Sequence, residues 1–171
     1  LRSNNFDFRL EADQADFTPL LGLVPQFARL GVGALGSFDL SVLGSAANPS
    51  IELVSPDLQV EVSGTTYRLQ ETHLNLDGVA LGVSSRVLGL TPISGDLQVA
   101  GDALLSLFPF NLSGTRLDIA GQADLNTFGR MTNVVGTLEQ LPDGTPSVQV
   151  EGLMGEKPLT IEGTLAPLAL T

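Results

Sequence analysis

A five-residue pattern of apolar, polar, apolar, any residue and glycine recurs along the chain. Its eight copies use eight of the nineteen glycines. Successive side chains of a strand point to opposite faces, so each copy puts two apolar residues on one face and a polar residue on the other. Glycine adopts the positive φ that a turn or bulge needs. Each copy predicts the end of a strand and the entry to a turn, and the copies are Leu40–Gly44, Val60–Gly64, Leu74–Gly78, Leu97–Gly101, Phe110–Gly114, Leu117–Gly121, Val148–Gly152 and Leu159–Gly163.

Turn signals between the copies support a meander of similar antiparallel strands. They are found at Asn48-Pro49, Ser55-Pro56, Pro92–Gly95 and Pro142–Gly144. The spacing between copies is irregular, which argues against a strict solenoid. The longest gap, residues 121–148, has room for one or two strands that lack the pattern. No linker or charge run divides the chain, so we expect a single unit over residues 1–171.

Helical signals are slight. Phe17, Leu20, Leu21 and Val24 have helical spacing behind a cap at Asp16 or Thr18, and Pro25 limits this helix to about two turns. A second short turn of helix is possible over residues 102–108. The prediction is therefore an all-β fold: a curved antiparallel sheet that forms an open hydrophobic groove, with one or two short helical plugs.

Composition and charge exclude several classes of protein. Charged residues make up only 16% and apolar residues 43% of the chain, and the net charge is −11. A single lysine, Lys157, and seven scattered arginines cannot neutralise a phosphate backbone, so nucleic-acid binding is excluded. The same charge disfavours an anionic membrane surface. The absence of cysteine excludes disulfides and thiolate metal sites. The longest apolar-rich stretch, residues 17–30, is interrupted by two prolines, a glycine and an arginine and is too short to span a membrane.

The titratable residues do not form a recognisable catalytic or metal centre. The single histidine, His73, alternates with Leu74 and Leu76, so it is expected on the polar face and has no second histidine with which to bind a metal. Most carboxylates also occupy polar positions of the alternation, as Glu61, Asp118, Glu151 and Glu162 do. A glycosidase-type carboxylate pair would usually sit among aromatic platforms, and the chain has no tryptophan and one tyrosine.

Two short motifs are better explained as structure or chance. Asp143-Gly144-Thr145 resembles an aspartic protease triplet, but prolines flank it on both sides, which predicts a turn. Asn111-Leu-Ser113 matches a glycosylation sequon, but its asparagine is the polar residue of a repeat copy. We expect no enzyme activity and no cofactor.

The apolar rows are the remaining candidate for function. They could form either an ordinary sandwich core or an acyl-chain surface, and alternation alone does not separate the two. Composition favours an acyl-chain surface, because the rows are aliphatic and a closed core of this size usually recruits more aromatic rings. The expected lipid-lining residues are Leu40, Val42, Val60, Val62, Leu74, Leu76, Leu97, Val99, Phe110, Leu112, Leu117, Ile119, Val148, Val150, Leu159 and Ile161.

Residues 36–53, GSFDLSVLGSAANPSIEL, resemble a recurring phrase of TamB-like proteins within the wider AsmA-like group. The phrase is a strand, a glycine, a step of small residues, Asn-Pro and another strand. Residues 153–165 are similar to the returning strands of these proteins, and the lead-in at residues 15–31 fits as well. The resemblance is local at residues 36–53 and looser over the rest of the chain.

The resemblance implies a β-taco, which is a long sheet with a continuous hydrophobic groove. It implies a periplasmic segment of an inner-membrane-anchored envelope protein that conducts phospholipid toward the outer membrane, without catalytic residues. Alternatives are an assembly or chaperone module for outer-membrane proteins, acting with a barrel partner of the TamA or BamA type, and a closed β-sandwich of a surface protein. The chain opens on Leu1 and closes on the apolar run at residues 165–170, so we expect a segment excised from a longer protein. We also expect this segment to self-associate through its sheet edges.

Overall fold

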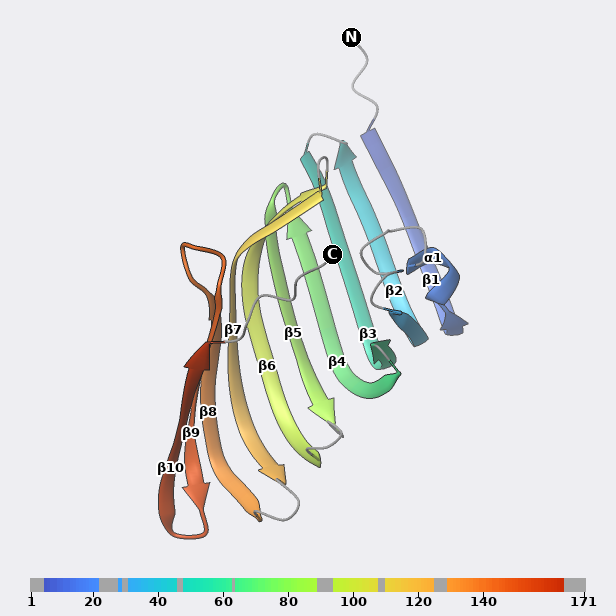
Figure 1. Ribbon diagram of the computed structural model, residues 1–171. Helices are drawn as coiled ribbons and strands as arrows, with labels where there is room; N and C mark the ends of the chain where they lie inside the picture. The colour runs from blue at the N-terminus through green and yellow to red at the C-terminus, as the bar shows by residue number, and fades with distance from the viewer. Residues whose placement is uncertain are drawn as a thin grey trace.

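The computed structural model describes residues 5–21, 28, 31–45, 48–62, 64–88, 94–107, 110–124 and 129–164. These residues form ten strands and one short helix (Figure 1). The elements are β1 (Asn5–Asp16), α1 (Thr18–Leu21), β2 (Gly33–Ser45), β3 (Asn48–Val62), β4 (Thr65–Asp77), β5 (Ala80–Leu88), β6 (Ser94–Leu107), β7 (Phe110–Asp124), β8 (Arg130–Gln140), β9 (Pro146–Met154) and β10 (Lys157–Thr164).

The ten strands make one open antiparallel sheet in which each strand pairs with its neighbours in the sequence. This confirms the all-β antiparallel meander, and β8 is the strand expected in the long gap without the repeat pattern. A closed sandwich needs two facing sheets. The described strands form a single sheet with β1 and β10 at its edges, so the fold does not support that alternative. The apolar run at residues 165–170 lies outside the described residues.

The first expected helix is represented by the single turn Thr18–Leu21, and Val24 and Pro25 of that expectation lie outside the described residues. The second expected helix is wrong. Asp16 caps the single turn of α1, with its Oδ1 accepting the Thr18 N–H at 2.9 Å. Residues 102–107 belong to β6 instead of a helix. In this segment Leu105 pairs with Leu112 of β7. Because β7 supplies partners for the backbone, the ladder outweighs the local helical tendency.

The repeat glycines occupy three kinds of position in the sheet. Gly44, Gly64 and Gly78 have positive φ where β2, β3 and β4 end, as predicted. Gly114 and Gly121 also have positive φ but lie inside β7, at or next to its register shifts. The expectation of a strand end and a turn is wrong for these two, and also for Gly101 and Gly152, which lie inside β6 and β9. Gly163 lies in β10, one residue before the end of that strand.

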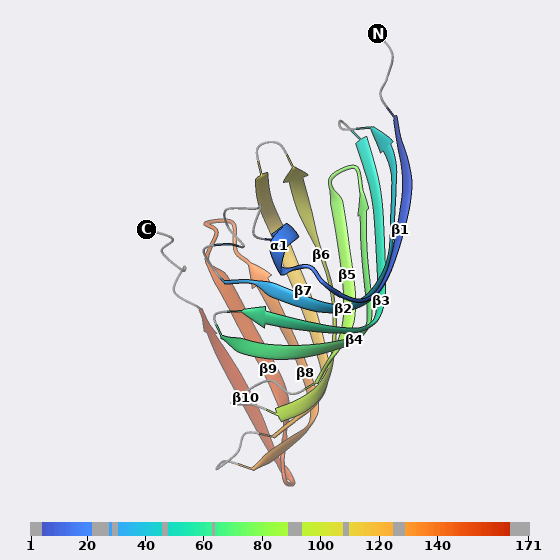
Figure 2. The same cartoon turned by 90° about the vertical axis from the view of Figure 1, so that its right-hand side faces the viewer.

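A line of irregularities crosses β1 to β5 at one height of the sheet. The register shifts between Ala12 and Ala15, between Ser37 and Asp39, and between Gln70 and His73. Gln14 and Glu71 have positive φ there. Ser55-Pro56, expected in a turn, lies at the same height inside β3, where a bulge tolerates a residue without an N–H. Bulges bend a strand, and Figure 2 shows β2, β3 and β4 bending strongly.

Three side-chain hydroxyl groups form hydrogen bonds at these register shifts, where the ladder of backbone hydrogen bonds is interrupted. Ser55 Oγ donates to the Ser37 carbonyl oxygen at 2.6 Å. Thr72 Oγ1 and Ser85 Oγ lie 2.9 Å apart, and Ser85 Oγ also donates to the Gln70 carbonyl oxygen at 3.3 Å. Ser55 and Thr72 are buried, so these bonds satisfy polar groups that would otherwise destabilise the bend.

A small core forms on one side of the sheet around Met131 and Val134, which pack with Leu97 and Ala123. Val134 is 4% exposed, whereas its neighbour Val135 points to the other side and is 64% exposed. We expect Val134→Ala to lower the free energy of unfolding by about 1–2 kcal/mol, because it leaves a void in the cluster. Val135→Ala is the matched control and should change it by less than about 0.5 kcal/mol. Urea denaturation of both variants measures the difference, and equal losses would contradict this placement.

Candidate functional site

The strand registers bring the apolar residues together on one side of the sheet, which we call the apolar face. Directly paired residues of neighbouring strands share a face. One row of such pairs crosses all ten strands and contains only aliphatic residues and glycine: Leu10, Leu40, Leu53, Leu74, Val83, Gly101, Leu117, Leu138, Val148 and Gly163. The apolar face is this row together with the residues that alternate with it in phase.

All sixteen residues expected to line a lipid surface occupy register positions of the apolar face. For Phe110 and Leu112 only the backbone is described, and it pairs with Leu107 and Leu105. Of the others, Leu76 and Leu97 are buried, Ile161 is exposed, and the rest are half-buried. The shared phase of the eight copies is therefore a property of the folded sheet.

The repeat pattern missed several residues of the apolar face. Met131 and Val134 are among its most buried members, at 2% and 4% exposure. They are three residues apart because an irregularity at Asn133, with φ of 52°, breaks the alternation of β8. The pattern also missed Phe8 and Leu10 of β1, since that strand has no copy. A sequence signal for Met131 and Val134 would have been two apolar residues that flank a predicted bulge.

Few groups cover the apolar face within the described part of the chain. Phe17, just before α1, packs edge-on against Phe38 of β2 with ring centroids 4.3 Å apart. The Phe17 N–H donates to the Ala34 carbonyl oxygen at 2.8 Å, which holds this corner in place. Figure 1 shows α1 beside β1 and β2. The described helix therefore covers one corner of the face.

The opposite side of the sheet, which we call the polar face, carries the ion pairs. Arg9 Nε donates to Asp39 Oδ1 at 2.9 Å, and Arg68 Nε donates to Asp57 Oδ1 at 2.8 Å. Arg86 Nε donates to Asp96 Oδ1 at 2.6 Å. His73, Glu61, Asp118, Glu151 and Glu162 are exposed at positions of this face, as predicted. The sheet thus separates charge from apolar surface.

These ion pairs make stability sensitive to acid. The hydrogen bond from the paired arginine is the main cause that holds the pKa of Asp39, Asp57 and Asp96 below the ordinary value of 3.8. A lowered folded-state pKa means that the stabilisation is complete above the unfolded pKa and is lost as pH falls through the folded one. We expect unfolding free energy to decline as pH falls below about 4. The variant Asp96→Asn should decline less steeply in urea titrations, and an unchanged slope would contradict this role.

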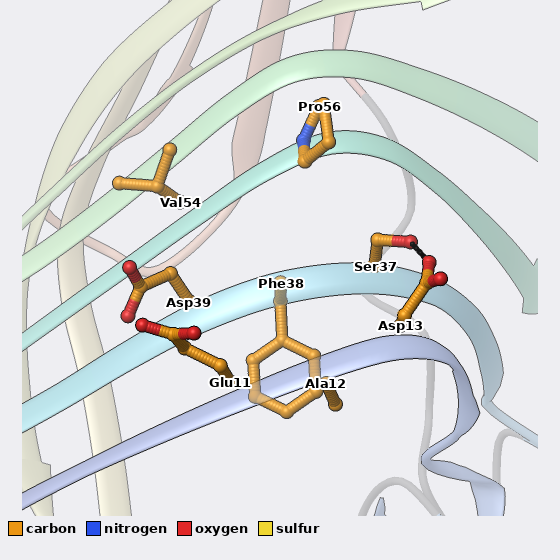
Figure 3. A pocket seen from close by; sticks show the side chains of 8 residues that line it. All are labelled: Glu11, Ala12, Asp13, Ser37, Phe38, Asp39, Val54 and Pro56. Carbon is orange, nitrogen blue, oxygen red and sulfur yellow. Dashed lines mark hydrogen bonds between the residues drawn. The ribbon is translucent and has the colours of Figure 1, made fainter.

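A hollow lined by described residues lies on another part of the sheet, at the bulges of β1 to β3. It has a volume of about 580 Å³ and contains none of the sixteen residues. Figure 3 shows Glu11 and Asp39 on one side of Phe38 and the hydrogen-bonded pair Ser37 and Asp13 on the other. Both Glu11 and Asp39 are engaged by Arg9. The hollow is acidic: Glu11 and Asp39 serve the ion-pair network, and Asp13 accepts a hydrogen bond from Ser37 Oγ at 2.7 Å.

The protease-like triplet and the glycosylation sequon both lie in regular parts of the fold. Asp143 Oδ1 accepts the Thr145 N–H at 2.9 Å, and Gly144 has positive φ, so the triplet is the predicted turn between β8 and β9. The sequon at Asn111 falls at the start of β7. Within the described ranges, no group of three or more histidine, aspartate or glutamate residues is placed to hold a metal ion. No helix among the same residues is long and apolar enough to cross a bilayer.

Comparison with protein-family models, with curated proteins and with solved structures finds no match to this chain.

Proposed function

We propose that the chain binds acyl chains on its apolar face and acts as one segment of a conduit that carries phospholipid across the cell envelope. The observation that carries this proposal is the row of aliphatic and glycine positions that crosses all ten strands of a single open sheet. A soluble antiparallel sheet normally packs its apolar side against a second layer. A surface of this extent left accessible is typical of a binding site.

The chemistry of the face suits movement as well as binding. Burial of each methylene group of an acyl chain is worth about 0.8 kcal/mol, so two lipid tails bind through surface area alone. Aliphatic side chains offer no hydrogen bond that would hold a tail at one place. The hydroxyl groups of Ser55, Thr72 and Ser85 are already bonded within the sheet and leave the path smooth. The head groups would remain in water beyond the strand ends.

The bend also favours this role. A sheet that curves toward its apolar side brings apolar side chains from distant strands closer together, and the buried residues lie on that side. Phe38, Leu76 and Val134 are each 6% exposed or less although the sheet has one layer. An acyl chain on such a surface contacts side chains on more than one flank. We therefore favour an open groove of the β-taco kind.

Lipid analysis of the purified chain tests the proposal. We expect phospholipid to co-purify with it, identified by mass spectrometry of an organic extract, and a fluorescent fatty acid to bind in competition with that lipid. A chain that carries no lipid and binds no fatty acid would refute the proposal.

The cellular setting is part of the same proposal and comes from the resemblance at residues 36–53. We propose that the segment lies in the periplasm, in a protein anchored at the inner membrane, with transport toward the outer membrane.

The second candidate function is assembly of outer-membrane proteins together with a barrel partner of the TamA or BamA type. Its supporting observation is that β1 and β10 are the edge strands of the described sheet, and an extended client strand can add to a sheet edge. A peptide with alternating apolar and polar residues should then bind to delipidated protein. Binding of lipid without peptide would favour the conduit over this candidate.

A further inference from the structure

The two edge strands leave apolar surface uncovered on the same face. Phe8 and Leu10 of β1 are 48% and 45% exposed, and Ile161 of β10 is 44% exposed. The other large hydrophobic residues of such exposure whose side chains are described lie on the polar face or, for Val79, in a turn. Interior strands are flanked on both sides, so their apolar-face residues are better covered. Among the described strands, neither edge therefore has an outer neighbour whose side chains alternate in the same phase.

The strand count makes one neighbour compatible with both edges. An antiparallel sheet of ten strands has its first and last strands running in opposite directions. When a second copy is placed beside the first with its apolar face on the same side, its β1 runs antiparallel to β10 of the first. The antiparallel hydrogen-bond ladder of one copy then continues into the sheet of the next copy. We propose that β10 of one copy pairs with β1 of the next copy, so that the apolar face extends from one chain to another.

One register of this junction fits the side chains. With Leu10 opposite Ile161, Phe8 lies opposite Gly163 and Arg9 lies opposite Glu162. Gly163 has no heavy atom within 4 Å of the place where a Cβ would stand, so the aromatic ring can cover it. The arginine and the glutamate attract across the polar face. A shift by two residues would instead place Asp7 opposite Glu162, where two carboxylates repel.

The same register explains where the pairing ends. Lys157 and Pro158 at the start of β10 would lie opposite Gln14 and Asp13, at the irregularity of β1. An inward lysine and a proline both resist strand addition, and the ladder of β1 is already interrupted there. The junction therefore spans residues 159–163 of one copy and residues 8–12 of the next.

The second copy is a better occupant than a client strand, because both halves of this junction exist in one chain. The contact is head to tail, so each junction leaves one free β1 and one free β10. Assemblies should grow beyond dimers, in contrast to a closed pair of two β10 strands. The net charge of −11 opposes growth, so added salt should promote it by screening.

Edge-blocking variants test the junction. Leu10→Lys blocks β1 and Ile161→Lys blocks β10, each at an exposed edge position, with far-UV circular dichroism to confirm folding. We expect the wild-type chain to form a concentration-dependent series of oligomers in analytical ultracentrifugation, and each variant alone to sediment as a monomer of 17.9 kDa. An equimolar mixture should form a dimer of twice that mass, since one free edge of each kind remains. A wild-type chain that stays monomeric at its highest soluble concentration, or dimers of one variant alone, would overturn the proposal.

Charge exchange tests the register. Glu162→Arg alone and Arg9→Glu alone each place like charges at the junction and should weaken association. Mixing the two proteins makes every junction between unlike copies attractive again, so association should return to the wild-type level. The same weakening in the mixture as in each variant alone would show that these two residues do not meet.

Discussion

Replacing Val99 with aspartate is expected to remove most of the acyl-chain binding of this protein. Val99 lies half-buried in the middle of β6, paired with Ser85 on one side and with Ile119 on the other. A carboxylate there would have to lose its hydration when a lipid tail covers it, which is costly without a partner. Since about 1.4 kcal/mol corresponds to a factor of ten, we expect fatty-acid affinity to fall at least about tenfold.

Gln98→Asp is the matched control for this variant. Gln98 is the preceding residue of the same strand and is exposed on the polar face. The new charge is the same, and only the face differs. Titration of a fluorescent fatty acid into both variants, with circular dichroism to confirm folding, measures the effect. Equal binding by the two variants would show that the apolar face is not the lipid surface.

Replacing Gly101 with alanine is expected to lower the free energy of unfolding by about 2–3 kcal/mol, as overpacking does in a tightly packed site. Gly101 pairs with Leu117 of β7 on the apolar face. A Cβ added at Gly101 would overlap the Arg116 carbonyl oxygen and stand 3.0 Å from the Leu117 Cα. Backbone atoms held in a ladder cannot move aside as the end of a flexible side chain can.

Gly163→Ala separates this effect from the general effect of alanine in a strand. Gly163 is also the last residue of a repeat copy and lies in β10, but no heavy atom lies within 4 Å of the place where its Cβ would stand. We expect its replacement to be neutral within about 0.5 kcal/mol. Urea denaturation at low protein concentration, where edge pairing is minimal, compares the two. Similar losses in both variants would mean that the close approach of β6 and β7 is not what requires glycine at position 101.

The face of most strand residues could be predicted from the sequence, because alternation is a local property of an extended chain. Leu40 and Val42 belong to one face in any strand that contains them both, whatever its partners are. The same reasoning placed His73 and Glu61 on the polar face. It failed at Met131 and Val134, where an extra residue changes the phase of β8.

The sequence alone determined the strand character and the polarity of each face, since these follow from neighbouring residues. Only the tertiary structure decided which repeat glycines turn the chain, as Gly44 does, and which admit a close neighbour, as Gly101 does. It also decided that residues 102–107 extend a strand and that Ser55-Pro56 marks a bend and not a turn. The physical reason is that backbone hydrogen bonds join residues far apart in the chain, and the ladder they form selects among conformations that each short segment would allow by itself.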